Sequence, residues 1–115
     1  FGHPVGDHVL ISVAKSLLPM LRKEDILARM GGEEFSILLP ETSIQAATFI
    51  AERIRLQQSK ICLTGDWAGE IRITVSIGVS SMKAKEKSFD ALFSRTDQAL
   101  YRAKNTGRNK VVGVE

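Results

Sequence analysis

The stretch Met30-Gly31-Gly32-Glu33-Glu34-Phe35 decides how the rest of the chain is interpreted. It joins two apolar runs, residues 26–30 and 35–39. Two adjacent glycines between such runs predict a tight hairpin turn, because glycine accepts positive φ without steric strain. Glycine also lets main-chain N–H groups approach an anion closely, and the carboxylates that follow attract hard cations such as Mg²⁺. For the motif in isolation, a surface hairpin with solvated glutamates would be favoured, so the remainder of the chain has to decide.

The 115 residues predict one domain with a modest core. A net charge of +3 is too small for a general nucleic-acid binder, but the basic residues are unevenly placed. Residues 95–110 contain one acid, Asp97, and a cluster of bases, namely Arg95, Arg102, Lys104, Arg108 and Lys110. This local excess favours an anionic ligand.

Cys62 is the single cysteine, which excludes an internal disulfide and favours a reducing cytoplasm and a packing role for its side chain. No apolar run approaches the roughly 18 to 20 residues that span a membrane, and no signal peptide is visible. We therefore expect a soluble, cytoplasmic domain that makes no membrane contact itself. Because the chain begins at Phe1 rather than methionine, we expect an excerpt from a longer parent, in which a membrane anchor is compatible with these observations.

The first half of the chain predicts a helix on either side of the hairpin. Apolar residues at helical spacing predict a helix over residues 7–21, with Asp7 as its N-cap. Pro19 should kink or loosen the last turn, because proline removes a backbone donor. After the hairpin, Thr42 and Gln45 have capping-box spacing, which predicts a second helix that reaches about residue 59.

The second half predicts two further strands, a helix and a closing strand. Residues 61–63 form a candidate short strand, followed by a turn-rich loop over 64–70, and residues 71–80 alternate between apolar and polar. Ser88 is a candidate cap for a helix that ends near residue 105, where Gly107 terminates it, and residues 110–114 offer the last strand. The order of elements indicates an α+β domain with a largely antiparallel sheet and helices on one or both faces.

Four segments, residues 1–7, 29–35, 74–79 and 97–109, resemble the GGDEF domain of bacterial diguanylate cyclases. They stand in the family's order and span nearly the entire chain. The resemblance implies a palm-like fold related to nucleotide cyclases and polymerases, with a mostly antiparallel central sheet flanked by helices. It implies that two GTP are condensed into cyclic di-GMP with release of two pyrophosphates. Each domain holds one GTP, so the reaction implies a homodimer.

The resemblance assigns the hairpin to catalysis. Glu33 corresponds to the family's metal-binding acid, which would hold Mg²⁺ or Mn²⁺, and Glu34 occupies a second acidic position that supports the site. Gly31 and Gly32 would bring backbone donors to the phosphates of GTP. These roles suit the chemistry, since deprotonating a 3′-hydroxyl and aiming it at an α-phosphate are tasks that carboxylate-held metal ions perform in related reactions.

Three other residues correspond to GTP-binding positions of the family. Lys104 and Arg108, four apart at the end of the last predicted helix, would grip the triphosphate, although cations are also favourable at a helix C-terminus. Asp7 would read guanine, because a carboxylate accepts from the N1–H and the 2-amino group, which adenine lacks. Its alternative role as an N-cap is nearly as well supported by spacing.

Arg22 and Asp25 match the family's RxxD inhibitory site for the product. Arginine can bond guanine O6 and N7, and a carboxylate can take the guanine donors, so this pair would bind cyclic di-GMP and inhibit synthesis allosterically. The alternative is a solvated i, i+3 ion pair. Arg53, on the second helix, lies where the family sometimes supplies a further arginine to the same product.

The chain departs from the family at its start. The family begins with a strand that carries another metal-binding aspartate, followed by helices with a guanine-recognising asparagine. We therefore expect residues 1–115 to form a partial GGDEF domain that lacks the first strand and helix and does not cyclise GTP alone. The intact parent would be the enzyme, with an N-terminal sensory or dimerisation domain. The alternatives are a non-catalytic cyclic di-GMP receptor and, ranked last for lack of an aromatic platform, a nucleic-acid binder.

Overall fold

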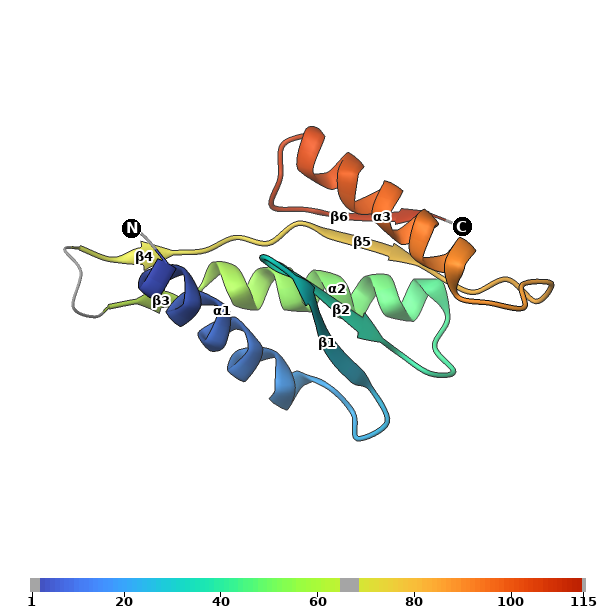
Figure 1. The fold of residues 1–115 in the computed structure, drawn as a ribbon, viewed down its shortest axis with the longest axis horizontal. Helices are drawn as coiled ribbons and strands as arrows, with labels where there is room; N and C mark the ends of the chain where they lie inside the picture. Colours follow the sequence, from blue (N-terminus) through green and yellow to red (C-terminus); the bar gives the residue numbers. More distant parts are fainter. Residues whose placement is uncertain (1–2, 65–68, 115) are drawn as a thin grey trace. The chain divides into compact units, whose positions relative to one another are not determined.

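The computed structural model describes residues 3–64 and 69–114 (Figure 1). The elements are α1 (His3–Leu17), a 3₁₀ turn η1 (Leu18–Met20), β1 (Ile26–Gly31), β2 (Glu34–Leu38), α2 (Ile44–Ser59), β3 (Cys62–Leu63), β4 (Ile71–Arg72), β5 (Ile77–Ser80), α3 (Asp90–Asn105) and β6 (Val111–Val114). The predicted α+β class is confirmed. The chain divides into two compact units, Phe1–Glu41 with Ile61–Arg72, and Thr42–Lys60 with Ile73–Glu115.

In the first unit, α1 begins at His3, four residues earlier than predicted. Asp7 therefore lies within the helix, so the prediction that it is the N-cap is wrong. Pro4 does not prevent this early start. Proline breaks helices at interior positions, but it is tolerated in the first turn, where its missing N–H would have no intrahelical acceptor. At the other end, α1 stops at Leu17 and gives way to the 3₁₀ turn that contains Pro19, so the predicted loosening is confirmed but the predicted helix end at residue 21 is wrong.

The remaining strands of the first unit form two antiparallel pairs. In the hairpin, β1 pairs with β2 from Ile26 opposite Leu38 to Gly31 opposite Glu34, with an irregularity between Arg29 and Gly31. In the second pair, β3 lies beside β4. Cys62 on β3 is exposed, so the predicted packing role is wrong. In so short a strand its neighbour Leu63 takes the more buried position. Residues 65–68 of the predicted loop lie outside the described residues.

The second unit is built on β5 and β6, which pair in parallel with Ile77 opposite Val111. Helices α2 and α3 both contact these two strands. The buried apolar side chains of the unit are small or branched: Ala51, Ile54, Val79, Leu92, Ala99 and Ala103. Gly78 faces the backbone of α3, and a Cβ built there would lie 2.3 Å from Leu100 N and 2.6 Å from Thr96 O. Strand and helix are therefore as close as a glycine allows.

The strand predicted over residues 71–80 is divided. β4 and β5 are separated by residues 73–76, and they pair with different partners, β3 and β6. The alternation of half-buried and exposed residues does hold from 71 to 75. Alternation reports which face is covered, but a strand also needs a hydrogen-bonded neighbour. The described strands form two antiparallel pairs and one parallel pair, so the pairing is mostly antiparallel, as predicted.

For α2 and α3, the ends of the helices were predicted correctly but the N-caps were not. The N-cap of α2 is Ser43, whose Oγ accepts from Ala46 N at 3.1 Å, so the prediction of Thr42 as the cap, one residue earlier, is wrong. α3 starts after Phe89 with no side-chain cap, so the predicted Ser88 cap is also wrong. The predicted ends at Ser59 and Asn105 are confirmed.

Candidate active site

The tip of the hairpin is an open turn. Gly31 has φ +128° and Gly32 φ +52°, and a Cβ on either residue would meet no atom within 4 Å. Glycine is therefore required here by backbone conformation and not by crowding. The predicted Gly-Gly turn is confirmed, and the empty space beside it leaves the backbone accessible to a ligand.

Arg29 closes this turn from within the hairpin. Its Nε and Nη2 donate to the carbonyl oxygen of Gly32 at 3.1 Å and 2.7 Å. Sequence reasoning quoted Arg29 as part of the motif but gave it no role. The i, i+3 spacing across a glycine turn is the signal that could have found this contact, because it brings the guanidinium over the turn carbonyl.

Glu33 and Glu34 are exposed, Glu33 in the turn and Glu34 on β2 opposite Gly31. In residues 3–64 and 69–114, no group of three or more His, Cys, Asp or Glu side chains is arranged to hold a metal. Mg²⁺ usually keeps several waters and takes only one or two protein carboxylates together with substrate phosphates. An exposed carboxylate beside an open glycine turn fits that mode of binding.

The base of the hairpin is closed by Arg22 and Asp25. Arg22 Nη2 donates to Asp25 Oδ1 at 2.9 Å, and the backbone N of Arg22 donates to Asp25 Oδ2 at 2.7 Å. The two side chains do form the i, i+3 ion pair considered from the sequence, but it is not fully solvated, since the Asp25 side chain is 2% exposed and that of Arg22 46%. Burial by itself would raise the pKa of Asp25, yet the hydrogen bonds from Arg22 lower it to below its ordinary value.

Arg22 also ties the two ends of the hairpin together. Its Nη2 donates to the carbonyl oxygen of Pro40, 18 residues along the chain, at 3.0 Å. The segment that enters β1 is thereby bonded to the segment that leaves β2. The sequence carries no signal for this contact, because every residue has a carbonyl and only the fold selects which one is reached.

The C-terminal end of α3 presents the basic pair. Lys104 is half-buried in the last turn of the helix, whereas Arg108 lies beyond it, exposed, with φ +58°. The N–H of Arg108 donates to Ala103 O at 3.0 Å, which with Gly107 at φ +120° is the Schellman ending that the glycine predicted. Lys104 therefore lies in the last turn of α3 and Arg108 just beyond its end.

Polar contacts fix the turn that carries Arg108. The next residue, Asn109, has φ +47°, and its N–H donates to Ser76 Oγ at 3.2 Å. Arg55 on α2 donates through Nη1 to Asn109 Oδ1 at 3.0 Å and forms an ion pair with Glu52. Side-chain hydrogen bonds from Arg55 lower the pKa of Glu52. Sequence reasoning missed Arg55 and Asn109, which support the position of Arg108.

The structure brings some predicted residues together within each unit. In the first unit, the hairpin turn unites the glycines with Glu33 and Glu34, the RxxD residues are bonded to each other, and Asp7 lies exposed on α1. In the second unit, Lys104 and Arg108 share the end of α3, and Arg53 is exposed on α2.

Comparison with known protein families identifies the family to which the chain belongs. The model of the family described as "Diguanylate cyclase, GGDEF domain" matches residues 1–110. The chain belongs to the GGDEF family. This confirms the resemblance inferred from the four sequence segments, and the domain is called a GGDEF domain from here on.

Two curated relatives illustrate the match. The GGDEF domain is 47% identical over 112 residues to diguanylate cyclase DgcM of Escherichia coli, covering 97% of this chain and 26% of DgcM. It is 42% identical over 114 residues to the response regulator PleD of Caulobacter vibrioides, covering 98% of this chain and 25% of PleD. The chain thus spans about a quarter of the length of these relatives.

Solved structures confirm the fold. The GGDEF domain of DgcB from Caulobacter crescentus, solved in complex with c-di-GMP, has a TM-score of 0.91 and 33% identity, with 98% of this chain and 67% of that one covered. The active GGEEF domain of a diguanylate cyclase from Vibrio cholerae has a TM-score of 0.90 and 34% identity, with coverage of 100% and 72%. Among the described residues of the present GGDEF domain, every helix is too short or too polar to cross a membrane.

Proposed function

We propose that this GGDEF domain serves in a diguanylate cyclase that condenses two GTP into cyclic di-GMP and releases two pyrophosphates. The observation that carries the proposal is the intact Gly-Gly-Glu-Glu hairpin, with both glycines at positive φ, open space beside them and both carboxylates exposed. A solved relative whose hairpin is also named GGEEF is described as active.

The hairpin supplies the groups for metal and phosphates. Glu33 offers carboxylate oxygens to a Mg²⁺ or Mn²⁺ ion, and Glu34 on β2 supports the site. The open backbone at Gly31 and Gly32 lets N–H groups reach phosphate oxygens. When bound, such an ion neutralises phosphate charge and favours attack by a 3′-hydroxyl on an α-phosphate.

The remaining substrate contacts come from three residues whose surroundings support ligand binding. Asp7 is exposed within α1 and is not the helix N-cap, so the competing explanation for this carboxylate is removed, and we assign it to guanine. Lys104 and Arg108 stand at the end of α3 and would bind the triphosphate as charged donors. The exposed Arg108 is presented by a turn that other side chains hold in place.

We further propose that Arg22, Asp25 and Arg53 bind the product. The Arg22 side chain is 46% exposed although its guanidinium is bonded to Asp25 and Pro40, which leaves room for a guanine edge to approach it. In the parent enzyme, Arg22→Ala should leave synthesis measurable but make it insensitive to added cyclic di-GMP. Inhibition that is unchanged in this variant would refute the assignment.

The reaction joins two GTP, so we propose that two such domains act as a homodimer. The chain covers about a quarter of its curated relatives, and one solved relative joins a coiled coil to its GGDEF domain. We propose that the parent carries an N-terminal sensory or dimerisation domain and acts in the cytoplasm. We also propose that residues 1–115 alone are inactive, because synthesis requires the rest of the parent.

The test is to incubate the parent enzyme, beside its Glu33→Ala variant, with GTP and Mg²⁺ and to resolve the nucleotides by chromatography. Cyclic di-GMP from the parent but not from the variant is expected. Failure of both proteins to make product, with retained binding of cyclic di-GMP, would instead support the alternative of a non-catalytic receptor that acts through Arg22 and Asp25. The unaltered hairpin favours the enzyme.

A further inference from the structure

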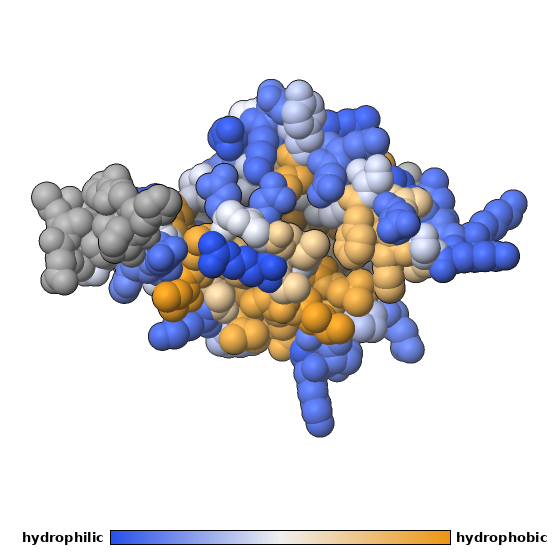
Figure 2. Space-filling view, viewed as in Figure 1, coloured by the Kyte–Doolittle hydropathy of each residue, from blue (hydrophilic) through white to orange (hydrophobic). Residues whose placement is uncertain are grey.

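The loop between β5 and α3 carries a run of exposed lysines. Residues 81–89 read Ser-Met-Lys-Ala-Lys-Glu-Lys-Ser-Phe, and Lys83, Lys85 and Lys87 are all exposed. This segment, named the lysine loop here, extends beyond the end of β5 and the start of α3 (Figure 1). On the same side of the view, hydrophilic side chains reach outward (Figure 2). The GTP and product sites proposed above do not use it.

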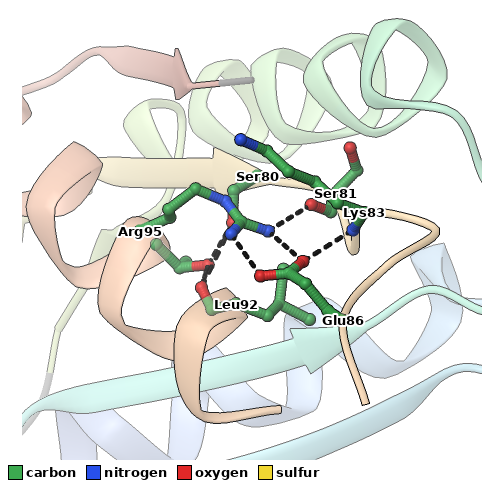
Figure 3. A network of polar contacts seen from close by, with 7 residues as sticks. Ser80, Ser81, Lys83, Glu86, Leu92 and Arg95 are labelled. Carbon is green, nitrogen blue, oxygen red and sulfur yellow. Dashed lines mark hydrogen bonds and ion pairs between the residues drawn. The ribbon is translucent and has the colours of Figure 1, made fainter. Parts of the chain in front are cut away.

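A network of polar contacts fixes the lysine loop to α3 (Figure 3). The N–H of Glu86 donates to Lys83 O at 3.0 Å, and the N–H of Lys83 donates to Glu86 Oε1 at 2.6 Å. Arg95 on α3 donates to Glu86 Oε2 at 2.6 Å through Nη1 and to Ser81 O at 2.6 Å through Nη2. The Glu86 and Arg95 side chains are 14% and 15% exposed. Hydrogen bonds from Arg95 to Glu86 and to the Ser81 carbonyl therefore tie the loop to α3.

This network also determines the charge that the loop presents. Glu86 is the only acid between the lysines, and hydrogen bonds from Arg95, then from Lys83 N, lower its pKa to about 2, so it is ionised and paired with Arg95. Within the described part of the chain, none of the three lysine ammonium groups forms a salt bridge. Asp90, at the first residue of α3, is the next acid along the chain. The outer surface of the loop is therefore cationic.

Apolar side chains stand at both ends of the lysine run. Met82 is 41% exposed and Phe89 48% exposed. The ring of Phe89 lies 5.9 Å from that of Phe93, with an angle of 39° between their planes. Exposed cations with exposed apolar side chains next to them in the sequence are suited to the boundary between lipid headgroups and acyl chains, where charges face phosphates and apolar groups enter the layer below.

We propose that the lysine loop is a peripheral docking site for a membrane surface rich in anionic phospholipids. Lysine is a compact charge that needs no fixed geometry in its partner, which suits a fluid layer of headgroups. Single-stranded nucleic acid is the less favoured partner, because the tilted phenylalanine pair does not form an open stacking platform.

This proposal revises the expectation that the domain makes no membrane contact. That expectation was based on the lack of an apolar run long enough to cross a bilayer. Crossing requires about 20 apolar residues, but peripheral binding requires only a few charges and a shallow apolar contact.

The test measures co-sedimentation of the protein with phosphatidylcholine vesicles, with and without phosphatidylglycerol. The triple variant Lys83→Gln/Lys85→Gln/Lys87→Gln is compared with a control, Lys15→Gln/Lys23→Gln/Lys60→Gln, which removes the same charge at other exposed lysines. Each loop lysine should contribute about fivefold to partitioning, so the triple variant should bind roughly 100-fold more weakly. Circular dichroism is used to check that both variants are folded. The single substitution Lys85→Glu, which replaces a positive by a negative charge in the lysine loop, should also weaken binding to anionic vesicles.

The expected result is binding to anionic vesicles that the control retains and the triple variant loses. Met82→Ala/Phe89→Ala should weaken the binding that remains at high salt. Equal loss in the triple variant and the control, or equal binding to phosphatidylcholine alone, would overturn the proposal. So would tight binding of single-stranded RNA together with vesicle binding that is indifferent to Met82 and Phe89, since this would identify a general polyanion site.

Discussion

The two ends of one hairpin are built in opposite ways. At the tip, Gly31 and Gly32 take backbone conformations that few residues accept, nothing crowds them, and the neighbouring glutamates are exposed. At the base, the Asp25 carboxylate is almost fully buried and accepts several bonds from Arg22, which also reaches Pro40. If the tip binds metal and phosphates as proposed, the fixed base would hold its residues in position. The tip should therefore govern activity and the base stability.

The largest effect on activity is expected from a substitution at the tip. Gly31→Ala adds a side chain at φ +128°, where L-residues are strained, so the turn must change shape and displace Glu33. Synthesis of cyclic di-GMP by the parent should fall by about 10- to 100-fold, since displacements of about 1 Å have effects of that size. The measurement is kcat/KM for GTP.

Gly6→Ala is the matched control. Gly6 lies in α1, has no φ in the left-handed region, and a Cβ there also meets no atom within 4 Å. Alanine in a helix is favoured over glycine by about 0.5–1 kcal/mol, so this variant should be slightly more stable and unchanged in rate. Equal loss of activity in the two variants would show that the conformation of the turn is not what matters.

At the base, the expected effect is on stability. Asp25→Ala removes a buried acceptor for the side chain and the backbone N–H of Arg22, which should lower the free energy of unfolding by about 1–3 kcal/mol. Glu24→Ala is the control, because Glu24 pairs with the same arginine at 3.4 Å but its side chain is 55% exposed. That variant should change stability by no more than about 0.5 kcal/mol. Urea unfolding distinguishes them, and similar losses would contradict a special role for the buried carboxylate.

The smallest expected effect is the dependence of the free energy of unfolding on pH, which tests the charge of Asp25 alone. Because the pKa of Asp25 is lower in the folded protein than its ordinary value of 3.8, the folded state binds fewer protons. The stabilisation is present above about pH 3.8 and is lost as pH falls through the folded pKa. The difference in stability between the protein and Asp25→Asn, followed by urea unfolding, should shrink over this acidic range. If this difference in stability stays constant as pH falls, the charge of Asp25 is not the origin of the stabilisation.

Sequence reasoning succeeded where the backbone itself imposes the pattern. The glycine turn, the end of α3 at Gly107 and the disturbance at Pro19 follow from the φ angles that these residues accept. The family was also predicted from short motifs, which carry residue identities at fixed spacing. Local conformational preference is a property of the residue, so it can be read before the fold is known.

What was missed depends on neighbours distant in sequence. The bond from Arg22 to Pro40 O and that from Arg55 to Asn109 join segments 18 and 54 residues apart. Residues 71–80 alternate like one strand, but their partners divide them into two. Periodicity along the chain carries no information about such partners.

Gly78 has a consequence for anyone who searches this protein by random mutagenesis. Any other residue at this position would push α3 away from β5, because the first side-chain atom would overlap the helix backbone. The same helix carries Lys104 and leads directly to Arg108. A screen for loss of cyclic di-GMP would therefore return Gly78 variants among the strongest hits, although glycine has no side chain with which to bind a nucleotide. Such hits would mark the spacing between two elements and should not be added to a map of the binding site.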